Sequence, residues 1–431
     1  MTGSTTTTGS GGTQKNVAND VSITTSASGI TLQDDGGSGG LASNYTLVGG
    51  THQVDITQAP VTIDLTRQYD GTTDASSNAT DSNTSEAYNG LIGSETLTLT
   101  GQGSVTNKNV AGGTQAVTLG TLAIGDQSGA TAASGGLASN YNFTSATLTI
   151  NQRVLNSNSS RVYDSTTTAA SSDILLTNQV TGETLQLSNA SATSNANVGS
   201  YSITNLSGIT ISDEAGANAS SGALAANYTL TGGTHNFAIN RKSVNISGTR
   251  EYDGTINIAA ADISTITDTV NSEVLAMSGG LGTTSSANVG AYNLTDTSQG
   301  TLILANGPSG ANQGLASNYT LTGGTQDYTI TQRVLSSSGS KVYDANTNAL
   351  AADITLSNLV SGETLNHSGT ASISSVNAAS YTITNLVGIT LADNAGLASN
   401  YTLTGGTHNF TVNPKVISLS GSRLYLSLIH I

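Results

Sequence analysis

The chain has 431 residues, including 12 Lys plus Arg and 27 Asp plus Glu, and its formal net charge is −15. So few scattered basic residues cannot form the positive stripe that a phosphate backbone requires, which excludes nucleic-acid binding. The absence of cysteine excludes disulfide scaffolds and thiolate metal sites. No apolar stretch is long enough to span a membrane, so we expect no membrane insertion in this segment.

Two landmarks recur along the chain with one shared period. An Asn-Tyr segment places tyrosines at 45, 141, 228, 319 and 401, spaced by 96, 87, 91 and 82 residues. A Tyr-Asp pair recurs with spacings of 94, 89 and 91 residues, at Tyr69-Asp70, Tyr163-Asp164, Tyr252-Asp253 and Tyr343-Asp344. Two independent markers with one period predict tandem domains.

The domain boundaries follow from these landmarks in chain order. Residues 1–57 correspond to the C-terminal half of a repeat, because Asn16-Val17 matches Asn109-Val110. Four complete repeats follow, at 58–151, 152–240, 241–331 and 332–413. Residues 414–431 begin a further repeat, and we interpret the tail 426–431 as artefactual. We therefore expect a fragment of a larger protein, without its signal peptide.

Within each repeat, the hydrophobic pattern has a period of two. Residues 61–65 and 96–100 alternate apolar with polar side chains and are rich in Thr and β-branched residues, as half-buried strands are. Clusters of Gly, Asn, Asp and Ser between these runs predict tight turns. Because each repeat contains many short strands, we predict an all-β fold of tandem immunoglobulin-like β-sandwiches. The junction at 239–241 runs from one strand almost directly into the next repeat, which predicts an extended array.

The Tyr-Asp pairs and later motifs carry a family resemblance. Gly71 and Gly254 follow the pair, Ser165 and Ala345 replace that glycine in the other repeats, and a Thr follows each pair within three or four residues. Together with the Val-Gly-x-Tyr and Asn-Tyr-Thr-Leu segments, they resemble the YDG and MBG-type bacterial immunoglobulin-like repeats of large secreted adhesins. These adhesins include filamentous-haemagglutinin-like proteins that are exported by two-partner secretion. The resemblance implies an extracellular or cell-surface array and supplies no catalytic residues.

The same motifs supply the residues that we predict to be structural. They are the four Tyr-Asp pairs, together with a late-strand tyrosine at Tyr201, Tyr292 and Tyr381. In immunoglobulin-like sandwiches a tyrosine near the start of a late strand hydrogen-bonds back to the backbone across a corner. A half-buried strand tyrosine without that bond is the alternative.

Three carboxylates recur in register and suggest calcium as the only candidate cofactor. They are Asp164, Asp173 and Glu183; Asp253, Asp262 and Glu273; and Asp344, Asp353 and Glu363. Three oxygen donors with added carbonyls suit a Ca²⁺ site at a domain junction. Alternatively, each Tyr-Asp aspartate caps a turn and each glutamate lies at a strand edge. A glycosidase pair is disfavoured, because a catalytic site occupies one cleft and these residues repeat.

Two further repeated positions favour structure over chemistry. His52, His235 and His408 follow Gly-Gly-Thr, but Gln326 takes that position in another repeat, an exchange that a metal ligand does not allow. The asparagine of the Asn-Tyr segment is interpreted as the start of a strand.

We therefore predict a non-catalytic stalk or spacer that projects a binding region or gives multivalent adhesion. Its expected partners are other domains of the same large adhesin. In the alternative, the repeats themselves bind a host or environmental glycan or protein through loops at the sandwich ends, with calcium-stiffened junctions.

Overall fold

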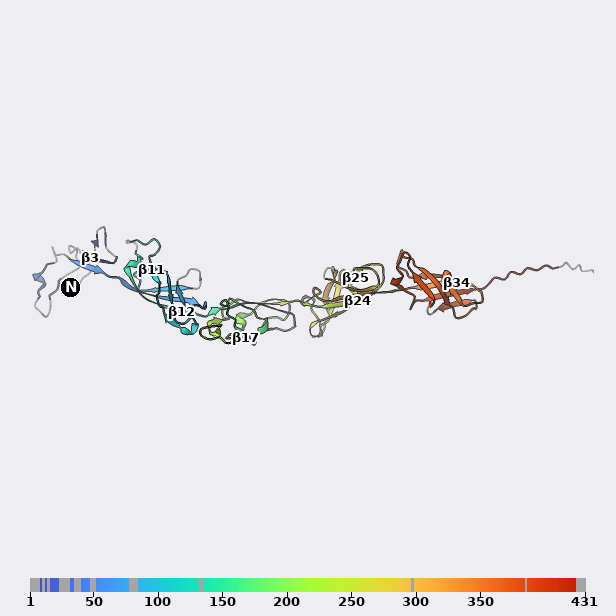
Figure 1. The fold of residues 1–431 in the computed structure, drawn as a ribbon, viewed down its shortest axis with the longest axis horizontal. Coiled ribbons are helices and arrows are strands. Elements are labelled where there is room, and N and C mark those ends of the chain that lie inside the picture. The colour runs from blue at the N-terminus through green and yellow to red at the C-terminus, as the bar shows by residue number, and fades with distance from the viewer. Residues whose placement is uncertain are drawn as a thin grey trace, which may run out of the picture. The chain divides into compact units, whose positions relative to one another are not determined.

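The structure is a computed structural model that describes residues 8–9, 12–13, 16–22, 32–34, 40–46, 52–76, 84–131, 135–295, 298–383 and 386–423. The tail 426–431 lies outside these residues. Strands carry the fold, as β12, β24 and β34 illustrate, and the helical elements among the described residues are single 3₁₀ turns (Figure 1). The prediction of an all-β fold built from β-sandwich repeats is confirmed. No helix in the described part of the chain is long and apolar enough to cross a membrane.

The chain forms two compact units. The first comprises residues 1–160, 167–194 and 200–238, and the second comprises 161–166, 195–199 and 239–431. Both units contain stretches of more than one sequence repeat, and we describe the contacts within each unit.

The repeat at 332–413 shows the architecture most completely. Its strands are β33 (Arg333–Val334), β34 (Ser336–Val342), β35 (Asn348–Leu350), β36 (Ile354–Ser357), β37 (Asn366–Ser372), β38 (Ala379–Ile383), β39 (Ile389–Ala392), β40 (Tyr401–Thr402) and β41 (His408–Asn413). One sheet has the order β36-β34-β41-β38, and the other has the order β35-β37-β39. The first long strand, β34, is antiparallel to β36 and parallel to the last strand, β41.

The core of this repeat lies between its two sheets. Ala349, Ala371 and Ile389 from one sheet form a single buried cluster with Phe410 and Val412 from the other. Alternation along β41 explains the packing, because His408, Phe410 and Val412 are buried while the residues between them are not. The period-two pattern therefore places one face of each sheet inward.

The other repeats use the same arrangement. In 241–331 the strands are β23 (Lys242–Ser243), β24 (Asn245–Glu251), β25 (Asn257–Ala259), β26 (Ile263–Thr267), β27 (Leu275–Gly279), β28 (Leu281–Thr283), β29 (Gly290–Asn293), β30 (Ile303–Asn306), β31 (Tyr319–Thr320) and β32 (Gln326–Thr331). In 152–240 they are β13 (Arg153–Val154), β14 (Asn156–Val162), β15 (Thr168–Ala170), β16 (Leu176–Thr177), β17 (Gln186–Ser188), β18 (Ala190–Ala192), β19 (Gly199–Ser202), β20 (Thr210–Ser212), β21 (Tyr228–Thr229) and β22 (His235–Asn240). Each has a four-stranded sheet, β26-β24-β32-β29 or β16-β14-β22-β19.

The N-terminal region follows the same plan. Its strands are β1 (Thr8–Gly9), β2 (Gly12–Thr13), β3 (Ala18–Ser22), β4 (Gln53–Ile56), β5 (Ala59–Gln68), β6 (Asp74–Ser76), β7 (Ser85–Asn89), β8 (Thr98–Thr100), β9 (Gln102–Ser104), β10 (Thr114–Ala116), β11 (Ala123–Gly125) and β12 (Tyr141–Asn151). The four-stranded sheet has the order β10-β12-β5-β7, and β5 runs parallel to β12 over ten paired residues. The first and last long strands of a repeat therefore lie side by side.

The core of the last repeat can be tested by truncating Phe410, which is 1% exposed. Replacing it with Ala removes a large side chain from between the sheets, which costs about 3–5 kcal/mol in comparable cores. We expect Phe410→Ala to lower the denaturant midpoint of the transition in which the β38 and β41 amides lose protection from hydrogen exchange. Val387→Ala is the control, because Val387 is 79% exposed and should leave that midpoint unchanged. Equal effects of the two variants would contradict the proposed core.

Candidate functional site at the repeat junctions

The tyrosine of each Tyr-Asp pair lies at the end of the first long strand of its repeat. Tyr69 is 0% exposed, Tyr163 is 6% exposed and Tyr252 is 4% exposed. Tyr343, the corresponding residue of the last complete repeat, is 37% exposed. The three buried tyrosines contact the repeat that follows in the sequence, and these contacts define three junctions.

At the first junction, one carboxylate accepts hydrogen bonds from two tyrosines. Tyr69 of repeat 58–151 donates to Oε1 of Glu183 at 2.6 Å, and Tyr228 of repeat 152–240 donates to Oε2 at 2.5 Å. The backbone amide of Val180 donates to the Tyr228 hydroxyl at 3.2 Å. The two rings meet edge to face with centroids 5.5 Å apart, an arrangement that aromatic pairs favour.

The same Tyr–Glu–Tyr contact forms at the second and third junctions. The second joins Tyr163, Glu273 and Tyr319, and both hydroxyls donate at 2.8 Å. The third joins Tyr252, Glu363 and Tyr401, and both donate at 2.6 Å. The ring pairs are again edge to face, at 5.4 Å and 5.5 Å. Each glutamate therefore serves two repeats, because one of its tyrosines belongs to the preceding repeat.

An asparagine pair accompanies each Tyr–Glu–Tyr contact. At the first junction, Asn227 donates from Nδ2 to Oδ1 of Asn109 at 2.8 Å and accepts from the Val110 amide at 3.0 Å. The matching pairs are Asn197 with Asn318 and Asn288 with Asn400. Asn227, Asn318 and Asn400 are almost fully buried, with 0–1% exposure. Each is the last residue of a 3₁₀ turn, η6 (Ala225–Asn227), η9 (Ala316–Asn318) or η11 (Ala398–Asn400), directly before the strand that it was predicted to begin.

The aspartate of each Tyr-Asp pair caps a turn on its own repeat. Asp164 accepts from the backbone amide and hydroxyl of Thr166, both at 2.9 Å, and forms an ion pair with Arg161. Burial opposes ionisation of Asp164, but the Thr166 hydrogen bonds and the Arg161 charge outweigh it and hold the pKa of this carboxyl below its usual value. Asp70 and Asp253 bind Thr72 and Thr255 in the same way.

The structure does not assemble the suggested calcium sites. In repeat 241–331, Asp253 caps its turn, Asp262 accepts from the Ala259 amide at 2.9 Å and Glu273 binds two tyrosines. Asp173 and Asp353, like Asp262, end 3₁₀ turns: η4 (Ser171–Asp173), η10 (Ala351–Asp353) and η7 (Ala260–Asp262). Among the described residues, no group of three His, Asp or Glu is placed to hold a metal ion. In this repeat, the three carboxylates that share a register thus have three different protein partners and do not converge on one point.

Two of the late-strand tyrosines hydrogen-bond back to an asparagine carbonyl four residues upstream. Tyr381 donates to the carbonyl oxygen of Asn377 at 2.6 Å, and Tyr292 donates to that of Asn288, which belongs to the third junction. A bond from a strand tyrosine to the backbone four residues upstream has the geometry of a tyrosine corner. Tyr201 lies half-buried on the equivalent strand, β19.

The exchange of His for Gln after Gly-Gly-Thr has a simple explanation. Nε2 of His235 lies 2.8 Å from the Leu230 carbonyl oxygen, and Nε2 of His408 lies 2.7 Å from that of Leu403. Gln326 donates from its own Nε2 to the Leu321 carbonyl at 2.9 Å. All three residues are buried. Either side chain can place an N–H against the carbonyl five residues earlier, so the position requires a donor.

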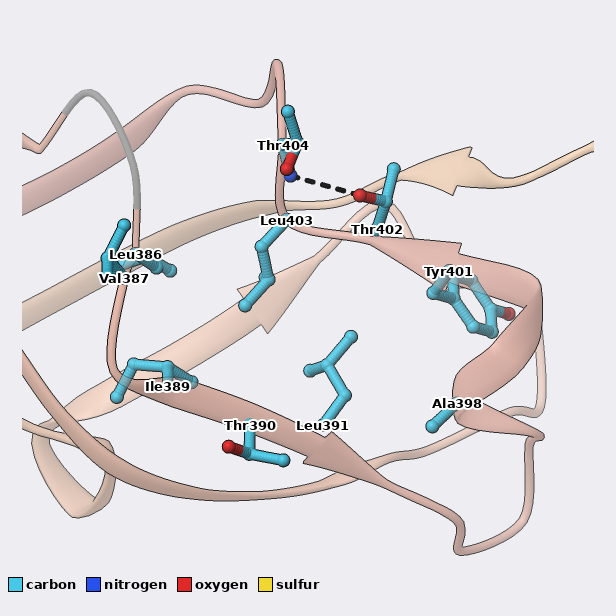
Figure 2. Close-up of a pocket in the computed structure, with 10 residues that line it drawn as sticks. All are labelled: Leu386, Val387, Ile389, Thr390, Leu391, Ala398, Tyr401, Thr402, Leu403 and Thr404. Atoms are coloured by element: carbon cyan, nitrogen blue, oxygen red, sulfur yellow. Dashed lines mark hydrogen bonds between the residues drawn. The ribbon is translucent and has the colours of Figure 1, made fainter.

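A groove of about 530 Å³ opens beside β39 and β40 in the last repeat. Leu391 and Leu403 point toward each other across it, and Thr404 donates its amide to the Thr402 hydroxyl at 3.1 Å (Figure 2). A groove of about 500 Å³ lies between the corresponding segments of repeat 241–331. Among the described residues, the lining of the first groove contains no acid–base pair, because its one ionisable group, Tyr401, is bound to Glu363.

Comparison with known families identifies the repeats. The YDG domain matches residues 51–150, 146–235 and 327–408, which together make up more than half of the chain. No curated protein matches the sequence.

The shared carboxylate can be tested by titrating the junction tyrosines. Burial and the hydrogen bond to Glu363 raise the pKa of both Tyr252 and Tyr401 from 10.0 to about 12. Since the folded-state pKa lies above the unfolded value, the contribution of these phenols to stability is fully present below pH 10 and is lost as the pH rises through about 12. Glu363→Gln should lower both pKa values, measured by tyrosinate absorbance or by NMR of the ring carbons. Glu214→Gln, which lies in a loop without a tyrosine contact, is the control. Unchanged tyrosine titration in Glu363→Gln would contradict the shared carboxylate.

The hydrogen bonds of the acidic residues also predict the response to calcium. A ligand that binds only the folded state raises the thermal midpoint. Because the junction glutamates and the Tyr-Asp aspartates already accept hydrogen bonds from protein groups, we expect the midpoint of the full chain to be the same in saturating Ca²⁺ and in chelator. A Ca²⁺-dependent rise that disappears in Glu273→Gln would instead show that the junction carboxylate binds the ion.

Proposed function

The chain belongs to the YDG-domain family, and we propose that it is a non-catalytic stalk or spacer of a bacterial surface or secreted adhesin. In this proposal the array projects a binding region carried by other domains of the same protein, or gives multivalent adhesion through its own repetition. The observation that carries the proposal is the junction, because the same Tyr–Glu–Tyr contact occurs three times.

The junction contacts suit a mechanical role. At the first junction, β12 ends at Asn151 and β13 begins at Arg153, so a single residue separates strands of successive repeats. Tyr69 and Asn109 contact the next repeat at two separate points. Two points of contact beside a short covalent link resist bending more than one link alone, since any hinge motion must break hydrogen bonds.

The chemistry of the repeats also supports a role without catalysis. The ionisable groups that repeat in register are held by structural partners: Glu183 by tyrosines and Asp164 by Thr166. A catalytic pair requires two groups in one cleft with pKa values driven apart, whereas each of these groups is engaged at a different place.

Ligand binding by the repeats themselves is the second candidate, and the groove beside β39 and β40 favours it because a similar groove recurs in the preceding repeat. Sugar sites use exposed aromatic platforms. Tyr69, Tyr228, Tyr252 and Tyr401 are committed to the junctions. These commitments favour the spacer over the binding module.

Solution scattering of the full chain tests the spacer. We expect an elongated particle whose maximum dimension falls when all three junction glutamates are replaced, in Glu183→Ala/Glu273→Ala/Glu363→Ala, because the phenols lose their shared acceptor and the repeats can bend. Far-ultraviolet circular dichroism should show that the repeats stay folded, and Glu86→Ala/Glu214→Ala/Glu251→Ala is the control with the same change of charge.

Two results would contradict the spacer. One is a compact wild-type particle, or scattering that the junction substitutions leave unchanged. The other is saturable binding of the full chain on a glycan array, which would favour the binding module.

A further inference from the structure

The three junctions are built in two chemically different versions. At the first and third, the residue after Tyr-Asp is Gly71 or Gly254, with φ of +82° and +80°. A Cβ added to either would lie 3.0 Å or 2.9 Å from a valine Cγ1 in the next repeat, Val180 or Val360. Glycine therefore allows a close approach at these two junctions, in addition to the positive φ.

The second junction has a side chain where the others have glycine. Ser165 also has a positive φ, 65°, and its Oγ accepts a hydrogen bond at 2.7 Å from Nδ2 of Asn271 in the next repeat. Asn271 occupies the position of Thr181 at the first junction and Ser361 at the third, one residue after the valine. At the first and third junctions a Cβ in this position would crowd the valine, whereas the serine at the second junction has a hydrogen-bond partner of its own.

A basic residue near the start of each following repeat also differs at the second junction, where Ser165 and Asn271 pair. Arg153 donates to Asn178 and, at 3.3 Å, to the Tyr69 carbonyl of the preceding repeat. Arg333 does the same with Asn358 and the Tyr252 carbonyl. At the second junction the equivalent residues are Lys242 and Asp268, which form an ion pair at 3.3 Å. The planar guanidinium can serve two partners at once, which a lysine point charge does less well.

These exchanges sort the repeats into two alternating kinds. The glycine-turn repeats are 58–151 and 241–331. In these repeats the loop that ends at the repeated glutamate has the sequence Gly93-Ser94-Glu95 or Asn271-Ser272-Glu273. The serine/alanine-turn repeats are 152–240 and 332–413, and their loops read Thr181-Gly182-Glu183 and Ser361-Gly362-Glu363. Every glycine turn contacts a loop with Gly before Glu, and the serine turn contacts a loop with Ser before Glu.

We propose that these residues are a specificity code by which each repeat accepts a neighbour of the other kind, so that the order of the array is fixed by its junctions. The specificity-determining residues are the one after Tyr-Asp and the one after the junction valine, exemplified by Gly254 with Ser361 and by Ser165 with Asn271. Such a code has a physical purpose, because similar adjacent domains are prone to misassembly during folding. The proposal goes beyond the spacer role and does not depend on it.

The test uses amide exchange at the third junction of the full chain. The Val289 amide donates to Asn400 across this junction at 2.9 Å, and its exchange reports whether the two repeats stay docked. Gly254→Ser places a side chain against Val360, so we expect Val289 to exchange on the order of tenfold faster than in the wild type. Adding Ser361→Asn supplies the partner that Ser165 has at the second junction, and we expect it to restore most of the protection.

Two controls separate the code from general damage. Gly405 has a φ of +86° and nothing within 4 Å of an added Cβ, so Gly405→Ser carries the backbone strain without the contact and should leave Val289 exchange unchanged. The Val198 amide, which donates to Asn318 at the second junction, should be unaffected in every variant. The proposal is overturned if Gly254→Ser exchanges like the wild type, if Gly405→Ser accelerates Val289 equally, or if Ser361→Asn restores nothing.

Discussion

The coupling between repeats depends on a glutamate whose two oxygens are each bonded to a tyrosine. A half-buried carboxylate is costly unless it is hydrogen-bonded, and here one of the two donors comes from the preceding repeat. Glu183 is therefore fully satisfied only when Tyr69 is docked, which makes the state of one repeat depend on its neighbour. In tandem arrays such nearest-neighbour terms add to the intrinsic stability of each repeat.

The elements around this contact hold its residues in place. The first long strand ends at the buried tyrosine, and the Asp70 or Asp253 turn follows at once, held by an arginine three residues before the aspartate. The guanidinium also reaches the carbonyl beyond the turn, as Arg67 does with Thr72 at 2.7 Å. The strand end, turn and tyrosine thus form one rigid piece. Reducing the flexibility of a docking element lowers the entropy that docking must overcome.

The sequence predicted the fold better than the site. Period-two alternation and a shared repeat length sufficed for the strands, because burial of alternate residues is a local property. The glutamates were recognised as repeated and were considered as metal ligands or as strand-edge residues. Their tyrosine partners were not predicted, because the sequence alone does not show that Tyr69 lies against Glu183, 114 residues away. A signal for this pairing did exist. The Asn-Tyr motif occurs once in every complete repeat, and the asparagine of Asn-Val also recurs in each, with Ala378 in place of the valine in the last. A neutral polar residue that persists in every repeat of a β-rich array is a candidate for an interface between repeats.

The repeats that lack the glycine after Tyr-Asp show what determines the residue at this position. Ser165 and Ala345 replace a glycine, yet both have a φ of 65°, close to the +80° of Gly254. The turn is therefore held by Asp164, its threonine and its arginine strongly enough to keep a residue with a Cβ in a strained conformation. Since the turn tolerates a Cβ, its backbone conformation does not by itself require glycine, and at the first and third junctions an added Cβ would lie 3.0 Å or 2.9 Å from the valine of the next repeat. Within one repeat, the glycine after Tyr-Asp is attributed to its positive φ. Packing against the next repeat also acts on this position, and the two effects can be separated only in a structure that contains linked repeats.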